Sequence, residues 1–193
     1  MGFRREELES FRDETVPDLV GDHVRLLFVG INPGLWTAAT GAHFAHPANR
    51  FYKALYLGGI LDRPLDASDG YDDAAVQALT CKGIAITNLV DRATVRASEL
   101  GREELRQGRD LIEDKARGWD PVVVAVVGVT AYRTAFGRRD ADVGRQDDKL
   151  GDAQLWVLPN PSGLNAHYQV DQLARLYRAA AEDAGLDLGP LRS

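Results

Sequence analysis

The amino-acid sequence predicts one α/β domain: a single three-layer α/β/α sandwich with a mainly parallel central sheet. Its 193 residues suffice for one domain with a sizeable core. Short apolar runs alternate along the chain with segments of helical periodicity, which is the order typical of α/β folds. The run at 122–127 is apolar without interruption, as expected of a parallel strand that is covered on both faces.

In the first half of the chain, Leu8 and Phe11 lie at helical spacing within a charged segment, and Pro17 ends that segment. We therefore expect an N-terminal helical extension over residues 1–22, with its helix at 3–15. The elements expected after it are a strand at 24–31, a loop at 35–47, a helix at 48–58, an acidic connection at 60–80 that includes a short helix at 72–79, and a strand at 83–89.

In the second half, Leu105 and Ile112 follow a period near 3.6 residues, as do Leu173 and Tyr177. These patterns predict helices at 101–117 and 169–184, and Gly185 ends the second of them. The other elements expected here are strands at 121–128 and 155–158, a short helix at 130–136, a polar surface loop at 137–152, and a tail at 186–193 that is frayed over 190–193.

The composition is that of an ordinary globular protein, with 45% hydrophobic and 27% charged residues. No apolar run approaches the ~20 residues that a membrane helix needs. The N-terminus has neither an apolar signal core nor the Ser or Thr of a myristoylation site. We therefore expect a cytoplasmic protein without a membrane partner. Because Cys81 is the only cysteine, an internal disulfide and a four-cysteine iron–sulfur cluster are excluded.

A sharp turn, Asn32-Pro33-Gly34, follows the first predicted strand. Proline removes a backbone donor and holds the residue before it extended, while glycine permits a positive φ, so the strand must end here. Asn32 is therefore expected at the carboxyl end of a central strand, where open α/β sheets bind ligands. Asn160-Pro161-Ser162-Gly163 repeats this arrangement after 155–158. The two turns could face one cleft, or each could be only a turn.

Four stretches resemble the mismatch-specific uracil/thymine-DNA glycosylases of the uracil-DNA glycosylase superfamily. They are, in family order, Gly30-Ile31-Asn32-Pro33-Gly34, Phe44-Ala45-His46-Pro47-Ala48-Asn49-Arg50-Phe51, Thr87-Asn88-Leu89-Val90-Asp91-Arg92 and Asn160-Pro161-Ser162-Gly163-Leu164. The resemblance implies base flipping and hydrolysis of the N-glycosidic bond of uracil mispaired with guanine in double-stranded DNA, with thymine and etheno-cytosine as further substrates. It also implies a monomer that uses water with no metal and no cofactor, and that lies at the nucleoid when bound to DNA.

Two residues are candidates for the catalytic step. The resemblance gives Asn32 the amide oxygen that positions the attacking water, and such orientation lowers a barrier by several kcal/mol. Uracil-specific members of the superfamily have aspartate here, so asparagine implies slower turnover and looser substrate choice. Asp91, just past the second strand, could polarise the water or stabilise the cationic sugar. Alternatively, Asp91 forms an ion pair with Arg92 that only holds the loop.

The expected base pocket rests on an aromatic surface. In the resemblance the flipped pyrimidine stacks on Phe44, against the alternative that Phe44 is ordinary core. Backbone amides around Ile31 and Phe44 could bind the carbonyl oxygens of the base. Thr37 and Asn88 are expected to line the same pocket, although some relatives carry lysine at the position of Asn88.

The segment Gly163-Leu164 resembles the wedge of the family, in which leucine fills the space left by the flipped nucleotide. Asn160, Ser162 and Asn165 offer hydrogen bonds to phosphates and to the opposite strand. Relatives often have arginine just after this loop, whereas this chain has Ala166-His167, so His167 is the candidate to replace it. The repair hypothesis requires that Asn32 and this wedge converge on one cavity.

Charge leaves an alternative open. The net charge of −6 argues against a broad nucleic-acid-binding surface. A local cluster of Arg92, Arg96 and Arg102 could still give modest, salt-dependent DNA affinity. The alternative to an enzyme is a non-catalytic nucleobase- or nucleotide-binding module of the same fold. A zinc site at His43 and His46 is disfavoured because no cysteine or suitably spaced acidic residue accompanies them.

Overall fold

A five-stranded sheet forms the centre of the computed structural model, which describes residues 2–165 and 167–192. The strand order is β2-β1-β3-β5-β4, and β4 alone is antiparallel to its neighbour. The strands are β1 (Leu26–Gly30), β2 (Ile84–Asn88), β3 (Val123–Val127), β4 (Gly144–Leu150) and β5 (Ala153–Leu158). The mainly parallel sheet predicted from the alternating pattern is confirmed.

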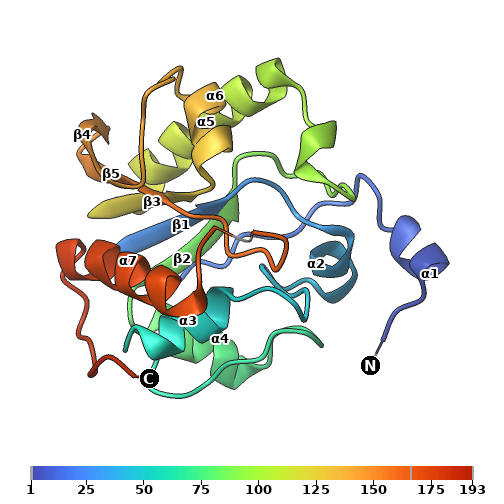
Figure 1. Ribbon diagram of the computed structural model, residues 1–193, viewed down its shortest axis with the longest axis horizontal. Coiled ribbons are helices and arrows are strands. Elements are labelled where there is room, and N and C mark those ends of the chain that lie inside the picture. Colours follow the sequence, from blue (N-terminus) through green and yellow to red (C-terminus); the bar gives the residue numbers. More distant parts are fainter. Residues whose placement is uncertain (1, 166, 193) are drawn as a thin grey trace.

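Helices cover both faces of the sheet (Figure 1). One face packs against α3 (Phe51–Leu57), α4 (Asp73–Thr80) and α7 (Val170–Asp183), and the other against α5 (Arg102–Trp119) and α6 (Val129–Ala135). Successive side chains of a strand point to opposite faces. Accordingly, Phe28 belongs to the core under α3 and α7, whereas Leu27 and Val29 belong to the core under α5 and α6.

Two predicted loops contain regular structure. Residues 35–47 include α2 (Leu35–Thr40), which begins directly after the Asn-Pro-Gly turn and ends at Gly41 with φ of 70°. A helix of this length is too short to show a hydrophobic period. Residues 137–152 include β4, an edge strand whose exposure alternates along a charged sequence. Charged edge strands hinder intermolecular pairing, and they lack the apolar pattern on which strand prediction depends.

The described segments near both ends of the chain contact the body of the domain. The N-terminal helix α1 (Arg5–Glu9) is shorter than predicted, and the chain after it runs along the outer edge of β2, where Leu19 pairs with Ile86. Up to Arg192 the tail is docked rather than frayed, since the Arg192 guanidinium donates to the carbonyl oxygen of Tyr56 at 2.6 Å, and Ser193 lies outside the described residues. Among the described residues, no helix combines the length and the apolar character that crossing a bilayer requires.

The register of the sheet brings the polar turns together. Gly30, the last residue of β1, pairs with Asn88, the last residue of β2. Because β5 is parallel to both, the turn that follows it opens at the same edge of the sheet. The pairing of β1 with β2 continues past the strands as a parallel bridge between Gly34 and Thr94.

Candidate active site

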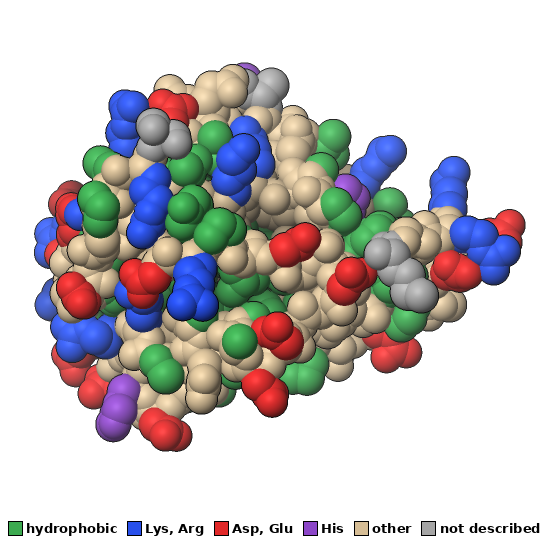
Figure 2. All heavy atoms as spheres, turned by 90° about the horizontal axis from the view of Figure 1, so that it is seen from below, with side chains coloured by type: hydrophobic (Ala, Val, Ile, Leu, Met, Phe, Trp, Pro, Cys, Tyr) green, Lys and Arg blue, Asp and Glu red, His purple; other side chains and the backbone are tan. Residues whose placement is uncertain are grey.

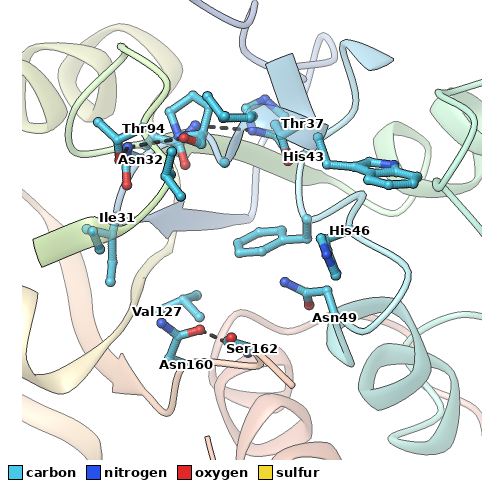
Figure 3. Close-up of a pocket in the computed structure, with 18 of the residues that line it drawn as sticks. Ile31, Asn32, Thr37, His43, His46, Asn49, Thr94, Val127, Asn160 and Ser162 are labelled. Carbon is cyan, nitrogen blue, oxygen red and sulfur yellow. Dashed lines mark hydrogen bonds between the residues drawn. The ribbon is translucent and has the colours of Figure 1, made fainter. Parts of the chain in front are cut away.

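A cavity of about 370 Å³ opens at the carboxyl edge of the sheet. In Figure 3, Asn32 and Thr94 lie on one side of it and Asn160 and Ser162 on the other, with Ile31 and Val127 between them. Seven of the residues predicted for the site line it: Ile31, Asn32, Thr37, Phe44, Asn88, Asn160 and Ser162. Segments far apart in the sequence therefore converge on one cavity, although the wedge residues Gly163 and Leu164 are not part of its lining.

The side chain of Asn32 has a fixed orientation. Its Nδ2 lies 2.8 Å from the hydroxyl of Thr94 and 3.1 Å from the carbonyl oxygens of both Pro33 and Arg92. All three partners accept hydrogen bonds from the amide nitrogen, and this network assigns the two ends of the amide. Since the nitrogen end is occupied by the protein, Oδ1 is the atom left for a ligand in the cavity.

Thr94 is a site residue that the sequence did not indicate. It is buried, and its hydroxyl accepts from Asn32 and donates to the carbonyl oxygen of Arg96 at 3.0 Å. The N-terminal segment holds this loop, because Ala93 exchanges backbone hydrogen bonds with Asp13 and Glu14 at 2.9 and 2.8 Å. Only the pairing of β1 with β2 brings Thr94 to Asn32, so no local pattern could have identified it.

Phe44 forms an aromatic wall with a second ring behind it. Its ring stacks on that of Phe51, with centroids 4.0 Å apart and planes 20° apart. Its backbone φ is 55°, a conformation that is costly for a residue other than glycine and that concentrates at functional sites. The buried hydroxyl of Tyr52 donates to the carbonyl oxygen of His43 at 2.8 Å and thereby holds the peptide bond that precedes Phe44.

The base of the cavity, where Phe44 lies beside Asn88 of β2, requires glycine at position 30. A β-carbon at Gly30 would overlap Oδ1 of Asn88 and would lie 3.4 Å from the ring of Phe44. The last position of β1 therefore needs glycine for space rather than for a positive φ. The arrangement leaves the Asn88 amide beside the aromatic ring at the base of the cavity.

His43 is buried and lines the same cavity beside Asn88. Its Nε2 lies 3.0 Å from the carbonyl oxygen of Pro17, which can only accept, so the proton is on Nε2 and Nδ1 accepts from Nδ2 of Asn88 at 3.3 Å. Burial lowers the pKa of His43, and Lys115 lowers it further. Its bond to the Pro17 carbonyl and the nearby Asp18 and Asp91 oppose that shift. The neutral imidazole thus fixes the orientation of the Asn88 amide.

Asp91 does not line the cavity, and half of its side chain is exposed. Its carboxylate lies 3.7 Å from Nζ of Lys115 on α5. The alternative of an ion pair with Arg92 is wrong in its partner, because Arg92 pairs instead with Glu104 at 2.6 Å and with Asp13 at 3.1 Å. A carboxylate that follows a strand end can turn toward the helix layer as readily as toward the crevice.

The predicted wedge follows a cavity-lining residue in the chain but does not itself line the cavity. Leu164 is 94% exposed, and Gly163 is exposed beside it, two residues beyond the cavity-lining Ser162. The side chain of Asn165 points back into the loop and donates to the carbonyl oxygen of Asn160 at 2.8 Å. His167 is exposed, and Ala166 lies outside the described residues.

Positive charge is sparse around the site. The guanidinium of Arg92 is occupied by its two carboxylate partners, which raise its pKa further. Arg96 and Arg102 are exposed, and neither forms an ion pair within the described part of the chain. On the face formed by α3, α4 and α7, acidic side chains lie between the basic ones, so no continuous basic strip crosses it (Figure 2).

Among the residues that the structure describes, neither His43 nor His46 belongs to a cluster of potential metal ligands. Both ring nitrogens of His43 have partners within the protein, and Nδ1 of His46 accepts from the backbone N–H of Ala48 at 3.1 Å. Over residues 2–165 and 167–192, no group of three or more His, Cys, Asp or Glu side chains has the arrangement that a metal ion needs.

Comparison with known proteins identifies the architecture. Residues 17–183 match the family model described as the Uracil DNA glycosylase superfamily. The fold is similar to the solution NMR structure of a "putative Uracil DNA glycosylase" from Methanosarcina acetivorans, with a TM-score of 0.63 and 15% sequence identity. That match covers 90% of this chain and 98% of the other. At this level of identity the structural likeness supports the fold.

Proposed function

The chain belongs to the uracil DNA glycosylase superfamily, and we propose that it is a monofunctional DNA glycosylase that removes uracil mispaired with guanine. The observation that carries this proposal is the convergence of an oriented asparagine amide and a one-sided aromatic platform on one cavity, with an exposed leucine two residues beyond the cavity-lining Ser162. Thymine and etheno-cytosine are further substrates in the proposal, because the aromatic platform tolerates different bases.

In the proposed reaction the flipped base enters with its ring parallel to Phe44. One face of Phe44 is occupied by Phe51, so a base can stack only on the face that lines the cavity. Such stacking contributes ~1–3 kcal/mol per base. The amide of Asn88, held by His43, presents its remaining polar atoms to the edge of the pyrimidine.

The water that attacks C1′ of the sugar is held by Oδ1 of Asn32. The glycosidic bond breaks with its electron pair moving to the base, and the oxygen of water forms the new bond to C1′. An amide cannot take up the proton, so Asn32 contributes orientation, while backbone N–H groups near Ile31 and Phe44 stabilise the departing anionic base. A lysine nucleophile is not part of the proposal, so strand cleavage is not expected.

We keep Asp91 in the proposal as a residue whose negative charge stabilises the cationic sugar from a distance. Its carboxylate is half exposed and partly neutralised by Lys115, so its stabilisation of the cationic sugar is screened. We expect Asp91→Asn to lower single-turnover cleavage by less than about tenfold. An unchanged rate would show that Asp91 serves the loop alone.

Leu164 is the proposed wedge. An almost fully exposed leucine at a loop tip gains from burial, and insertion between base steps provides that burial while offsetting the lost stacking. Contacts with phosphates come from Asn160, Ser162, Asn165 and His167 and from the unpaired Arg96 and Arg102. Because few described basic side chains near the site lack a carboxylate partner, we propose a modest affinity for DNA that falls steeply with salt concentration.

One experiment tests the proposal against its alternative. Labelled oligonucleotides with U or T opposite G, with U opposite A, and with U in a single strand are incubated with the protein, and free base is measured. We expect uracil release from the G·U duplex, and no release by Asn32→Ala, which still binds the duplex. Binding without release by the wild-type protein would favour the non-catalytic module, which its net charge of −6 also favours.

A further inference from the structure

The loop that carries Leu164 connects β5 to α7, and its described residues, 159–165 and 167–169, include no helix or strand. Irregular surface loops are mobile by default, and a mobile loop must be ordered when it inserts into DNA. Ordering would cost conformational entropy at each binding event. A loop that acts as a wedge therefore benefits from a device that holds it before DNA arrives.

Arg50 is placed to do this. Its guanidinium donates to four carbonyl oxygens of the loop: those of Ser162 and Asn165 at 2.9 Å, that of Tyr168 at 2.6 Å and, through Nε, that of Pro161 at 3.4 Å. Its backbone N–H donates to the carbonyl oxygen of Pro161 at 3.0 Å. Arg50 thus provides hydrogen-bond donors for backbone carbonyl oxygens spread along this loop. In a helix or strand, backbone N–H groups would provide them.

The same loop makes a close backbone approach to the segment before Arg50. A β-carbon at Gly163 would lie 2.8 Å from the carbonyl oxygen of Ala48. The loop is therefore docked at two points, by the guanidinium of Arg50 and by Gly163 against Ala48. Arg50 also precedes Phe51, the ring that supports Phe44.

We propose that Arg50 is a positioning residue that locks the loop carrying Leu164 onto the segment carrying Phe44, so that wedge and base platform form one preorganised unit. The role rests on the proposed function, although the clamp itself can be measured without DNA. A planar guanidinium with five N–H donors suits a set of diverging carbonyl acceptors, whereas an ammonium group cannot reach them together. Arg50 forms no ion pair within the described residues, so its charge is devoted to these carbonyls.

The first test uses hydrogen exchange of the free protein. In Arg50→Gln and Arg50→Lys, we expect peptides covering 160–168 to exchange at least about tenfold faster than in wild type, while β1 and α5 are unchanged. Arg175→Gln, on the exposed face of α7, is the matched control and should leave the loop unchanged. Unaltered exchange in both Arg50 variants would overturn the proposal. If Arg50→Gln does not fold, Arg50→Lys decides the question.

The second test compares DNA forms. We expect Arg50→Lys to lower kcat/KM about tenfold or more on a G·U duplex, and to change it little on single-stranded DNA, which needs no extrusion. The double variant Arg50→Lys/Leu164→Ala should lose little more kcat/KM on the duplex than Leu164→Ala alone, because both changes disable the same wedge. Equal losses on both DNA forms, or additive losses, would contradict the clamp. If no DNA releases uracil, the proposed function fails, and the exchange experiment still decides whether Arg50 holds the loop.

Discussion

The two ends of the cavity are fixed by different physical means. At one end, Asn32 follows a central strand, and its amide nitrogen is bound by three acceptors from the turn and the neighbouring loop. At the other end, the loop of Asn160 and Ser162 is irregular and held by a single guanidinium, and it carries Leu164, which is 94% exposed. Sheet geometry thus positions the atom proposed to act on water, whereas a side-chain clamp positions the group proposed to act on the DNA stack.

This difference predicts two kinds of defect. Changes at the strand end should impair base release from every DNA form, because the chemical step is shared. Changes in the wedge loop should impair release from duplex and spare single strands, because only the duplex requires extrusion. The first three predictions below test that division, from the largest expected effect to the smallest, and the fourth concerns the stability of the pocket.

Replacing Asn32 with aspartate should cause the largest loss. A carboxylate oxygen would replace Nδ2 and face the carbonyl oxygens of Pro33 and Arg92, which have no proton to give. We expect the side chain to rotate away and the single-turnover rate to fall at least about 100-fold on duplex and single strand alike. A rate above that of wild type would show that charge at this position matters more than orientation.

Thr94→Val should give an intermediate loss. Valine keeps the shape but removes the closest acceptor of Asn32, at 2.8 Å, and leaves two carbonyl acceptors in place. We expect kcat to fall about tenfold with KM nearly unchanged, since orientation rather than binding is affected. Thr94→Ser, which retains the hydroxyl, is the control and should stay close to wild type.

Gly163→Ala should give a smaller loss, confined to duplex DNA. Its new β-carbon would lie 2.8 Å from the carbonyl oxygen of Ala48, so the loop must move away from the segment that carries Phe44. We expect a decrease of several-fold on G·U duplex, up to about tenfold, and none on single strands. Gly118→Ala on α5, where a β-carbon meets nothing within 4 Å, is the matched control. Equal losses on both DNA forms would break the division between the two ends.

His43→Gln should change the pH dependence of stability. Burial lowers the pKa of His43 below its ordinary value of 6.5. Between that lowered pKa and 6.5 the unfolded chain binds the proton and the folded protein does not, so the free energy of unfolding falls as pH drops through this range. Glutamine does not titrate, and we expect a flatter profile in urea unfolding from pH 8 to pH 5. An identical slope in both proteins would exclude His43 as the cause.

Much of the fold could be predicted because its signals are local. Apolar runs identified the four parallel strands, and strand-terminal turns placed Asn32 and Asn160 at one edge of the sheet. The strand β4 was missed because its charged sequence carries no apolar alternation, and α2 because six residues show no period. Local signals fail where an element is stabilised by its neighbours rather than by its own sequence.

The sequence alone determined which chemical groups are present: the amide of Asn32 after a central strand, the aromatic ring of Phe44, and Leu164 beside a glycine. Only the tertiary structure decided which atoms are free to act. It turns Asp91 toward Lys115, brings Thr94 to the amide nitrogen of Asn32, and sets Arg50 against the wedge loop. Each of these contacts joins residues that are distant in the sequence, and their geometry depends on how the sheet and helices pack rather than on any local pattern.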